Sequence, residues 1–455
     1  MIASQETIAA LATPVGTAAL AVVRVSGPGS AGLARRIFSK EPLPRVSRHA
    51  DYRSLSGELL DDVVYTFYAG PRSYTGEDAL EISCHGNPFI AQRILEDLFA
   101  RGCRAAAPGE FTQRAFLGGR IDLSQAEAVM DVIHARSERA LALAQQQLRG
   151  ALGRKMAALI DELVDALART EAYIDFPDED LPAEDRGLVG QMVADVLRGT
   201  DELLATSHYG ELLRDGVRTV IIGEPNAGKS SLLNRLVGEE RALVSAEPGT
   251  TRDYIEARLL LGGHCLRLID TAGLNALPQP LERLGIAKTL EQASVADLFL
   301  VVLDVAHPAF VLPESLAGHL RADNTLVVLN KVDLLPEEGQ ASDLPACLGG
   351  FPQIRVSALS GAGFPVLEAA VVRAVDAFQR QVGGEAIAIN ARHAGALAEA
   401  RSRLRAVLAQ LQSSGAVELL ASDMRGALDA LGEISGRVDN ERMLDRLFST
   451  FCIGK

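Results

Sequence analysis

Apolar and polar residues follow different patterns along the chain, and the clearest one lies between residues 216 and 378. Short apolar runs rich in β-branched residues and leucine alternate there with helical stretches; the runs are 217–222, 266–269, 298–303, 326–329 and 354–356. Runs of this length that alternate with helices are typical of parallel strands buried on both faces of a sheet. This part of the chain is therefore predicted to be a doubly wound α/β domain.

Helical periodicity marks the regions on either side of this segment. Apolar residues recur at helical spacing in two stretches: Leu152, Met156, Leu159, Leu163 and Leu167, then Leu397, Leu404, Val407 and Leu411. This spacing places apolar side chains on one stripe of a helix, where they form a core. We predict a helical domain in two halves, residues 120–215 and 379–455, with the α/β domain inserted between them at 216–378.

The first 119 residues follow a third pattern. Apolar stretches such as 19–25 and 80–83 are separated by glycine, proline and polar turns. Short strands between such turns predict a separate α+β domain at residues 1–119. The expected fold is thus a multidomain chain of α/β and α+β class.

Composition indicates a globular protein that stays in the cytoplasm. Hydrophobic residues make up 48% of the 455 residues and charged residues 23%, and no segment suggests a membrane span. No basic cluster precedes the short apolar run near the start, so a secretory signal is not expected. The five cysteines lack the paired spacing of a zinc site or a disulfide framework. A net charge of -14 argues against a broad basic surface, so a partner is expected to supply much of any grip on RNA.

The strongest chemical signal is a glycine-rich loop between a predicted strand and a predicted helix. The sequence Gly223-Glu224-Pro225-Asn226-Ala227-Gly228-Lys229-Ser230 has the spacing of a phosphate-binding loop. Glycines there let main-chain N–H groups turn toward phosphate oxygens, Lys229 reaches the terminal phosphates, and the Ser230 hydroxyl ligates magnesium. The loop therefore predicts nucleotide binding.

Three further motifs follow in the order expected of a guanine-nucleotide site. Asp270-Thr271-Ala272-Gly273 ends a predicted strand and would place its carboxylate beside the magnesium. Asn330-Lys331-Val332-Asp333 follows the apolar strand 325–329, and Asp333 is predicted to select guanine by accepting hydrogen bonds from its amino and imino groups. Ser357-Ala358-Leu359 is predicted to close over the base with main-chain amides.

The residues predicted to contact GTP come from these motifs and from the segment 245–251. They are Asn226, Ala227, Gly228, Lys229, Ser230, Ser231, Ser245, Ala246, Glu247, Pro248, Gly249, Thr250, Thr251, Asp270, Thr271, Ala272, Gly273, Asn330, Lys331, Asp333, Ser357, Ala358 and Leu359. Glu282, Lys229 and Asp270 are the residues expected to serve catalysis.

The groups that usually assist GTP hydrolysis are not in their usual places. Leu274 stands where many G proteins have a glutamine that orients the attacking water, and no arginine finger is evident. Glu282 is the nearest well-placed carboxylate for the water, although an acidic residue there would equally suit a helix N-terminus or a solvent-facing position. The amide oxygen of Asn226, with oxygen ligands from 245–251, could hold a monovalent cation in place of the arginine, while Thr251 would meet magnesium.

Together with Phe451-Cys452-Ile453-Gly454-Lys455, these motifs resemble the tRNA-modification GTPase family called MnmE or TrmE, over nearly the whole chain. Matching segments in the N-terminal region include Arg24-Val25-Ser26-Gly27, Tyr74-Thr75-Gly76-Glu77-Asp78 and Gly109-Glu110-Phe111-Thr112-Gln113-Arg114-Ala115-Phe116. The Cys-x-Gly-Lys sequence at 452–455 is the most specific of these.

The resemblance implies a homodimer with an N-terminal folate-binding and dimerisation domain, a helical domain and an inserted Ras-like G domain. It implies a heterotetramer with an FAD-containing partner, MnmG, which modifies the wobble uridine of certain tRNAs at carbon 5, giving a carboxymethylaminomethyl type of product. The one-carbon unit would come from 5-formyltetrahydrofolate or methylenetetrahydrofolate. GTP hydrolysis would depend on potassium and on dimerisation of the G domains.

Residue by residue, the resemblance also implies ligand sets. Potassium would be held by Asn226, Ser245, Glu247 and Thr250, magnesium by Ser230 and Thr251, and the water through Glu282. Positions that contact the folate are matched by Arg24, Glu81, Arg120 and Lys455. Cys452 is a candidate site residue, although a lone cysteine without an identified base is more often structural.

Two other functions remain open from the sequence. A GTPase switch that binds RNA or the ribosome without modification chemistry would use the same nucleotide motifs, but the N-terminal domain and the Cys-x-Gly-Lys sequence argue against it. A folate-binding scaffold with a degenerate G domain conflicts with the intact Lys229, Asp270 and Asp333.

Overall fold

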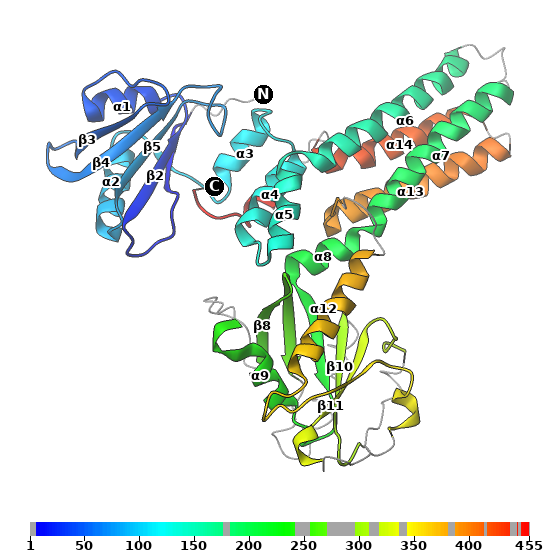
Figure 1. The fold of residues 1–455 in the computed structure, drawn as a ribbon. Helices are drawn as coiled ribbons and strands as arrows, with labels where there is room; N and C mark the ends of the chain where they lie inside the picture. The colour runs from blue at the N-terminus through cyan, green and yellow to red at the C-terminus, as the bar shows by residue number, and fades with distance from the viewer. Residues whose placement is uncertain are drawn as a thin grey trace, which may run out of the picture. The chain divides into compact units, whose positions relative to one another are not determined.

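The structure is a computed structural model that describes residues 6–175, 183–241, 255–270, 296–308, 318–335, 344–380, 387–413, 416–436, 444 and 447–454. The chain forms two compact units. One comprises Met1–Met130, Gln147–Val189 and Ser414–Lys455, and the other comprises Asp131–Gln146 and Gly190–Ser413. Figure 1 labels many of the elements of both units. Across the described ranges, no helix combines the length and apolar character needed to cross a membrane.

The strands are β1 (Ile8–Leu11), β2 (Leu20–Ser26), β3 (Ser47–Arg53), β4 (Leu59–Tyr68), β5 (Ala79–His85), β6 (Arg104–Ala105), β7 (Val217–Ile222), β8 (Ile255–Leu261), β9 (His264–Asp270), β10 (Leu298–Asp304), β11 (Thr325–Asn330) and β12 (Gln353–Arg355). The helices are α1 (Ser30–Phe38), α2 (Pro88–Ala100), α3 (Glu110–Leu117), α4 (Leu123–His134), α5 (Glu138–Leu148), α6 (Ala151–Asp175), α7 (Ala183–Ala205), α8 (Ser207–Asp215), α9 (Lys229–Arg241), α12 (Phe364–Arg380), α13 (Ala391–Gln412) and α14 (Val417–Ser435).

A six-stranded sheet organises the first unit, with the strand order β3-β4-β5-β2-β1-β6. Neighbouring strands are antiparallel except β6, which runs parallel to β1. Alternate residues of the central strands, such as Val23 and Ile82, form one core with Leu33 of α1 and Leu98 of α2. Because successive side chains point to opposite faces of a sheet, Arg24 and Glu81, which pair in register on β2 and β5, lie on the other face. The α+β class predicted for this region is confirmed.

Two long helices of this unit come from distant parts of the sequence. Helix α6 lies along α14 (Figure 1), and Arg425 of α14 forms an ion pair of 2.6 Å with Glu171 of α6. The five apolar residues whose spacing predicted α6 are all buried, namely Leu152, Met156, Leu159, Leu163 and Leu167. The residues 176–182, which include Pro177 and Pro182, lie outside the described part.

The second unit contains a doubly wound sheet with the order β12-β11-β10-β7-β9-β8. The five apolar runs found in the sequence are its five mutually parallel strands, which confirms the predicted α/β class. Strand β8, antiparallel to β9 at the sheet edge, was not predicted. The sequence feature that could have indicated β8 is the pair Gly262 and Gly263. Their positive φ angles of 57° and 80° make the tight turn between β8 and β9.

Burial on both faces explains why these strands are continuously apolar. Ile221, Leu300 and Val328 pack in one core with residues of α9 and α12. Val220 and Val301, one position away on the same strands, belong to a second core on the opposite face. The carboxyl ends of the parallel strands lie along one side of the sheet, and the loops that follow these ends carry the nucleotide motifs.

The segment 447–454 packs against the beginning of the chain. Phe448 and Phe451 share a core with Leu123 of α4. The N–H of Gly109 donates to the Cys452 carbonyl at 3.3 Å. A Cβ atom at Gly109 would lie 2.7 Å from the Phe448 carbonyl oxygen and 2.8 Å from the Phe451 Cβ. The close packing at Gly109 therefore depends on the absence of a side chain.

Gly109→Ala should loosen the 447–454 segment, because the added methyl group overlaps Phe448 and Phe451. Gly119→Ala is a matched control: both glycines have a φ of 67°, but a Cβ at Gly119 meets no atom within 4 Å. The control should lose about 1 kcal/mol of unfolding free energy for the backbone conformation, and Gly109→Ala about 2–4 kcal/mol.

Urea unfolding measures the two losses, and limited proteolysis shows whether cleavage after residue 444 becomes faster only in Gly109→Ala. Equal losses and equal cleavage in the two variants would show that the 447–454 segment is not held by this contact.

Candidate functional site

The glycine-rich loop predicted to bind phosphate connects β7 directly to α9. Gly223 approaches β10 so closely that a Cβ there would lie 2.1 Å from the Val302 carbonyl oxygen. Asn226 and Gly228 have positive φ angles of 65° and 92°, which turn successive peptide units within the loop. The conformation is that of a tight turn opening a helix, as the spacing predicts.

Lys229, the first residue of α9, lies beneath this loop. Its side chain is buried, and its ammonium donates to the carbonyls of Gly223 at 2.9 Å and Glu224 at 3.0 Å. The positive charge is thereby fixed at the amino end of the helix, where the helix dipole adds to it. An anionic phosphate would be attracted by both.

Asn330 connects the phosphate loop to the loop predicted to cover the base. Its amide nitrogen donates to the Ala227 carbonyl at 3.0 Å, and its amide oxygen accepts from the Ala358 N–H at 2.9 Å. Only 1% of the residue is exposed. Three motifs that are far apart in the sequence are thus joined through one side chain.

Lys331 and Asp333 lie beside this connection. The Lys331 ammonium donates to Asp304 at 2.8 Å, and Ser357 donates its hydroxyl proton to Asp333. Burial alone would raise the pKa of Asp304, but hydrogen bonds from Lys331 and the Ala306 N–H outweigh it and lower that pKa. Asp304 is therefore a fixed negative partner that holds Lys331 at the edge of the site.

The turn that begins at Ser357 is held from α9. Arg235 donates to the carbonyls of Ala358 at 3.3 Å, Leu359 at 2.8 Å and Ser360 at 3.1 Å. Leu359 itself is 82% exposed. An exposed apolar side chain on a loop that is fixed through its main chain suits a surface that covers a flat ligand.

The structure locates only part of the predicted nucleotide site. Ser230 and Ser231 are exposed residues in the first turn of α9, and Asp270 is the last residue of β9, where its main chain pairs with Ile221. Other predicted residues lie outside the described part, namely Ser245, Ala246, Glu247, Pro248, Gly249, Thr250, Thr251, Thr271, Ala272, Gly273 and Glu282. Their roles as ligands of GTP, magnesium, potassium or water stay predictions.

Two residues of this site were missed by the sequence reasoning. Asp304 ends β10 opposite Asn330 in the parallel register, so an acidic residue at the end of that buried strand was a usable signal. Arg235 gave no such signal, because an arginine on a helix is ordinarily a solvated surface charge. Only the three-dimensional approach of α9 to the 357–360 turn reveals its contacts.

Arg24 and Glu81, two of the residues predicted to contact a folate, line a pocket on the face of the N-terminal sheet opposite the α1 and α2 core. The pocket has a volume of about 200 Å³ and is lined by Arg24, Ser26, Tyr68, Tyr74, Thr75, Ala79, Glu81 and Phe111. Arg24 donates to Glu81 at 2.8 and 3.0 Å and to the Gly454 carbonyl at 3.3 Å. Its guanidinium lies 5.7 Å from the ring centre of Tyr74 and 5.8 Å from that of Phe111. Charge and aromatic surface therefore meet in one small cavity.

The other residues predicted for a folate lie apart from this lining or outside the described part. Arg120 is exposed, and its side-chain carbons lie against Gly76, where a Cβ would be 3.2 Å away. Cys452 is exposed, and Lys455 is not described. The structure thus brings together Arg24 and Glu81 and adds the aromatic side chains of Tyr68, Tyr74 and Phe111.

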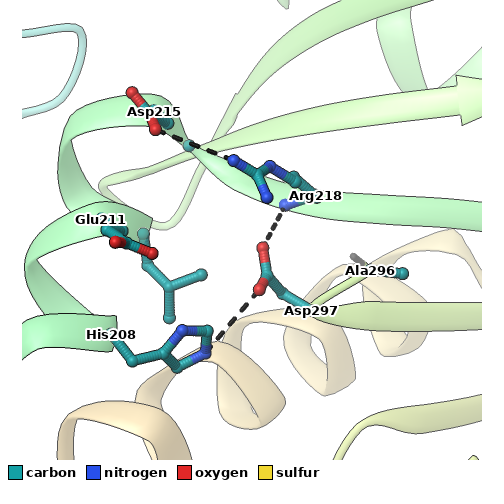
Figure 2. A pocket seen from close by; sticks show the side chains of 8 residues that line it. His208, Glu211, Asp215, Arg218, Ala296 and Asp297 are labelled. Carbon is teal, nitrogen blue, oxygen red and sulfur yellow. Dashed lines mark hydrogen bonds and ion pairs between the residues drawn. The ribbon is translucent and has the colours of Figure 1, made fainter. Parts of the chain in front are cut away.

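A polar pocket of about 230 Å³ lies at the opposite edge of the G-domain sheet, near the starts of β7 and β10 (Figure 2). Asp297 accepts a hydrogen bond of 2.8 Å from the Arg218 N–H and lies 3.7 Å from His208. Burial raises the pKa of Asp297, and the Arg218 hydrogen bond opposes that rise. None of the predicted nucleotide residues lines this pocket, so it is separate from the chemistry considered above.

Known proteins resemble the chain along almost its whole length. The family model described as the MnmE helical domain matches residues 123–452, and the model described as the GTP-binding protein TrmE N-terminus matches residues 7–120. The tRNA modification GTPase MnmE of Opitutus terrae is 57% identical over 451 residues, which are 99% of this chain and 99% of the relative. Proteins of the same name from Symbiobacterium thermophilum and Akkermansia muciniphila are 44% and 43% identical over 99% of this chain, covering 100% and 99% of the relatives.

Among solved structures, the G domain of the T. maritima FeoB iron transporter matches 35% of this chain and 98% of that chain. The sequence identity is 24% and the TM-score 0.25, a likeness too low to carry an inference.

Asn330→Ala should weaken nucleotide binding and lower the free energy of unfolding by about 2–4 kcal/mol, because it leaves the Ala227 carbonyl and the Ala358 N–H without their buried partner. Fluorescent mant-GDP titration and urea unfolding measure the two effects.

Asn324→Ala provides the matched control at the other end of β11. Asn324 is also buried, accepts from the Arg321 N–H and donates to the His319 carbonyl. It should lose stability while keeping nucleotide affinity once folded. If both variants bind mant-GDP equally well, Asn330 serves the sheet and not the nucleotide site.

Proposed function

The chain belongs to the MnmE family of tRNA-modification GTPases, and on that basis we propose that it uses GTP hydrolysis to drive modification of the wobble uridine of tRNA at carbon 5. The chain is a GTP-hydrolysing enzyme of tRNA modification. The proposal adds the modified position, the carboxymethylaminomethyl type of product, a tetrahydrofolate one-carbon donor, and an FAD-containing partner. It also retains the division into residues 1–119, 120–215, 216–378 and 379–455.

The observation that carries the nucleotide part is the Asn330 side chain, which joins the phosphate loop to the 357–360 turn. Phosphates would lie over Lys229 and the main-chain N–H groups of the loop, at the start of α9. The guanine ring would lie between Lys331 and the 357–360 turn, with Asp333 accepting from its amino and imino groups. The Ser357 hydroxyl, which donates to Asp333, fixes the orientation of that carboxylate.

Hydrolysis requires a water molecule to attack the γ-phosphorus while the bond to the β–γ bridging oxygen breaks, leaving GDP and phosphate. We assign orientation of that water to Glu282, because Leu274 cannot hydrogen-bond it. Ser230 and Thr251 would hold magnesium, and Asn226, Ser245, Glu247 and Thr250 would hold potassium. These cations, when bound, supply positive charge where negative charge develops in the transition state.

Asn226 suits a role at that position. It is exposed, and its φ of 65° is an uncommon conformation that Asn tolerates better than most residues. The main chain therefore turns at Asn226, and the side-chain amide oxygen of this exposed residue would reach a cation at the rim of the loop. Most of the other assigned cation ligands come from 245–251, so ligands from that segment would complete both cation sites.

The pocket at Arg24 is proposed as the folate site. Its aromatic walls, Tyr74 and Phe111, suit a flat pterin ring, and the Arg24–Glu81 pair offers both a donor and an acceptor to its polar edge. Arg120 and Lys455 would provide positive charge for the glutamate carboxylate of the cofactor. Cys452 is exposed and belongs to the segment 447–454, where its carbonyl accepts from the Gly109 N–H; it is kept as a candidate site residue.

Assembly follows from the same reasoning. The net charge of -14 suits a protein that relies on a partner for its grip on tRNA. We propose a homodimer that joins the FAD-containing partner MnmG in a heterotetramer, with hydrolysis stimulated when the two G domains meet.

Analysis of wobble uridines in tRNA tests the modification function. Cells that lack the protein should contain unmodified uridine at the wobble position of the affected tRNAs, and the gene for the intact protein should restore the modified nucleoside, as measured by mass spectrometry. Fully modified tRNA in the deletion strain would contradict the modification function and would support the alternative, a GTPase switch without modification chemistry.

GTP hydrolysis should be about tenfold faster or more in potassium than in sodium at equal ionic strength, because the assigned site replaces an arginine finger. Phosphate release measures the rate. Glu282→Ala should bind GTP normally and turn it over slowly in both salts, which separates loss of the cation from loss of the water-orienting group. Equal rates for the unaltered protein in the two salts would exclude the potassium site.

A further inference from the structure

The turn from Ser357 to Ala362 uses its main-chain donors almost completely. The N–H groups of Ser357, Ala358, Ser360, Gly361 and Ala362 donate to the Ala362 carbonyl, the Asn330 amide oxygen, the Ser357 hydroxyl, the Ser357 carbonyl and the Ser360 hydroxyl. Among the described residues, no acceptor is found for the Leu359 N–H. The turn thus presents one main-chain donor that is available to a ligand.

Arg235 fixes the peptide unit to which this donor belongs. The Leu359 N–H and the Ala358 carbonyl are two ends of the same planar trans peptide, so they point in opposite directions. The Arg235 guanidinium donates to the Ala358 carbonyl, and also to the carbonyls of Leu359 and Ser360. Holding the carbonyl toward α9 directs the N–H away from α9.

The surroundings hold Arg235 in this position. Its guanidinium lies 5.6 Å from the ring centre of Phe364, at the start of α12. Gly361 admits it closely, because a Cβ there would lie 2.2 Å from a guanidinium nitrogen. Gly361 and the Phe364 ring therefore define the position of the Arg235 guanidinium.

We propose that Arg235 is a positioning residue for base selection: it orients the Ala358–Leu359 peptide so that the Leu359 N–H donates to the 6-oxygen of guanine. Adenine carries an amino group at this position, and two donors facing each other would repel. Asp333 accepts from the amino and imino groups of the base, whereas the Leu359 N–H donates to its 6-oxygen. Asp333 and Leu359 therefore select guanine through different atoms. This inference rests on the proposed nucleotide site.

Purine analogues separate the two readings of the base. Inosine diphosphate keeps the 6-oxygen and the N1–H and lacks the 2-amino group, whereas 2-aminopurine riboside diphosphate keeps the 2-amino group and lacks both the 6-oxygen and the N1–H. Equilibrium competition of GDP and both analogues against fluorescent mant-GDP gives three affinities for each variant of the full chain. The variants are Arg235→Ala, Arg235→Lys and the control Arg321→Ala, which removes another exposed arginine of the same unit that pairs only with Asp323 in the described part.

Arg235→Ala should weaken GDP and inosine diphosphate by the same factor of about five to ten, the size expected for losing one aligned hydrogen bond. The affinity for 2-aminopurine riboside diphosphate should stay within about twofold, since that base makes no bond to Leu359. Arg235→Lys, which cannot bridge three carbonyls, should fall between Arg235→Ala and the unaltered protein. Arg321→Ala should change none of the three.

An equal loss for all three nucleotides would make Arg235 a merely structural residue, and an unchanged GDP affinity would remove it from the site. If Arg235→Ala does not fold, Arg235→Lys decides by the same ratio of affinities. The unaltered protein tests the underlying site separately: if it binds GDP no more tightly than either analogue, the assignment of Asp333 and the 357–360 turn to the base fails, whatever Arg235 does.

Discussion

The hydrogen bonds of Asn330 are the interaction on which the candidate nucleotide site depends. A primary amide carries its donor and its acceptor on two different atoms, so it can donate to one main-chain group and accept from another at the same time. At the end of β11, it is buried between the phosphate loop and the 357–360 turn, and it satisfies a polar group in each. The parallel sheet brings these loops to one edge, but sheet geometry alone would leave their separation undefined. Asn330 sets that separation.

Positive and negative charges around this amide are also arranged by the sheet. The register of β10 against β11 places Asp304 opposite Asn330, so the next residue, Lys331, meets a carboxylate directly. Lys331 adopts a left-handed conformation, with a φ of 67°, as the chain leaves the strand. A backbone conformation that is uncommon outside glycine is tolerated here because the ion pair and the adjoining turn hold it.

Much of the G-domain fold could be predicted from the sequence, because a strand buried on both faces must be continuously apolar. The five parallel strands and the glycine-rich loop follow from that constraint and from spacing. Strand β8 escaped because it lies at the sheet edge, where Glu256 and Arg258 interrupt the apolar run that marks a strand buried on both faces. Of the site, Asn330, Lys331 and Asp333 could be found from their order after a strand. Arg235 could not, since its contacts depend on how α9 approaches a turn more than a hundred residues later in the chain.

The pocket at Arg24 has a consequence for how the protein is made. One acceptor of the Arg24 guanidinium is the Gly454 carbonyl, which lies 430 positions later in the sequence. A ribosome that has completed the whole N-terminal sheet has therefore still to synthesise both helical segments and the G domain before this acceptor exists. During that interval the sheet can fold, yet the Arg24 guanidinium in its pocket lacks this acceptor. Chains interrupted late in synthesis would consequently contain all the nucleotide motifs, while Arg24 in the N-terminal pocket would lack its Gly454 partner. The N-terminal pocket is therefore complete only in a chain that has been synthesised as far as Gly454.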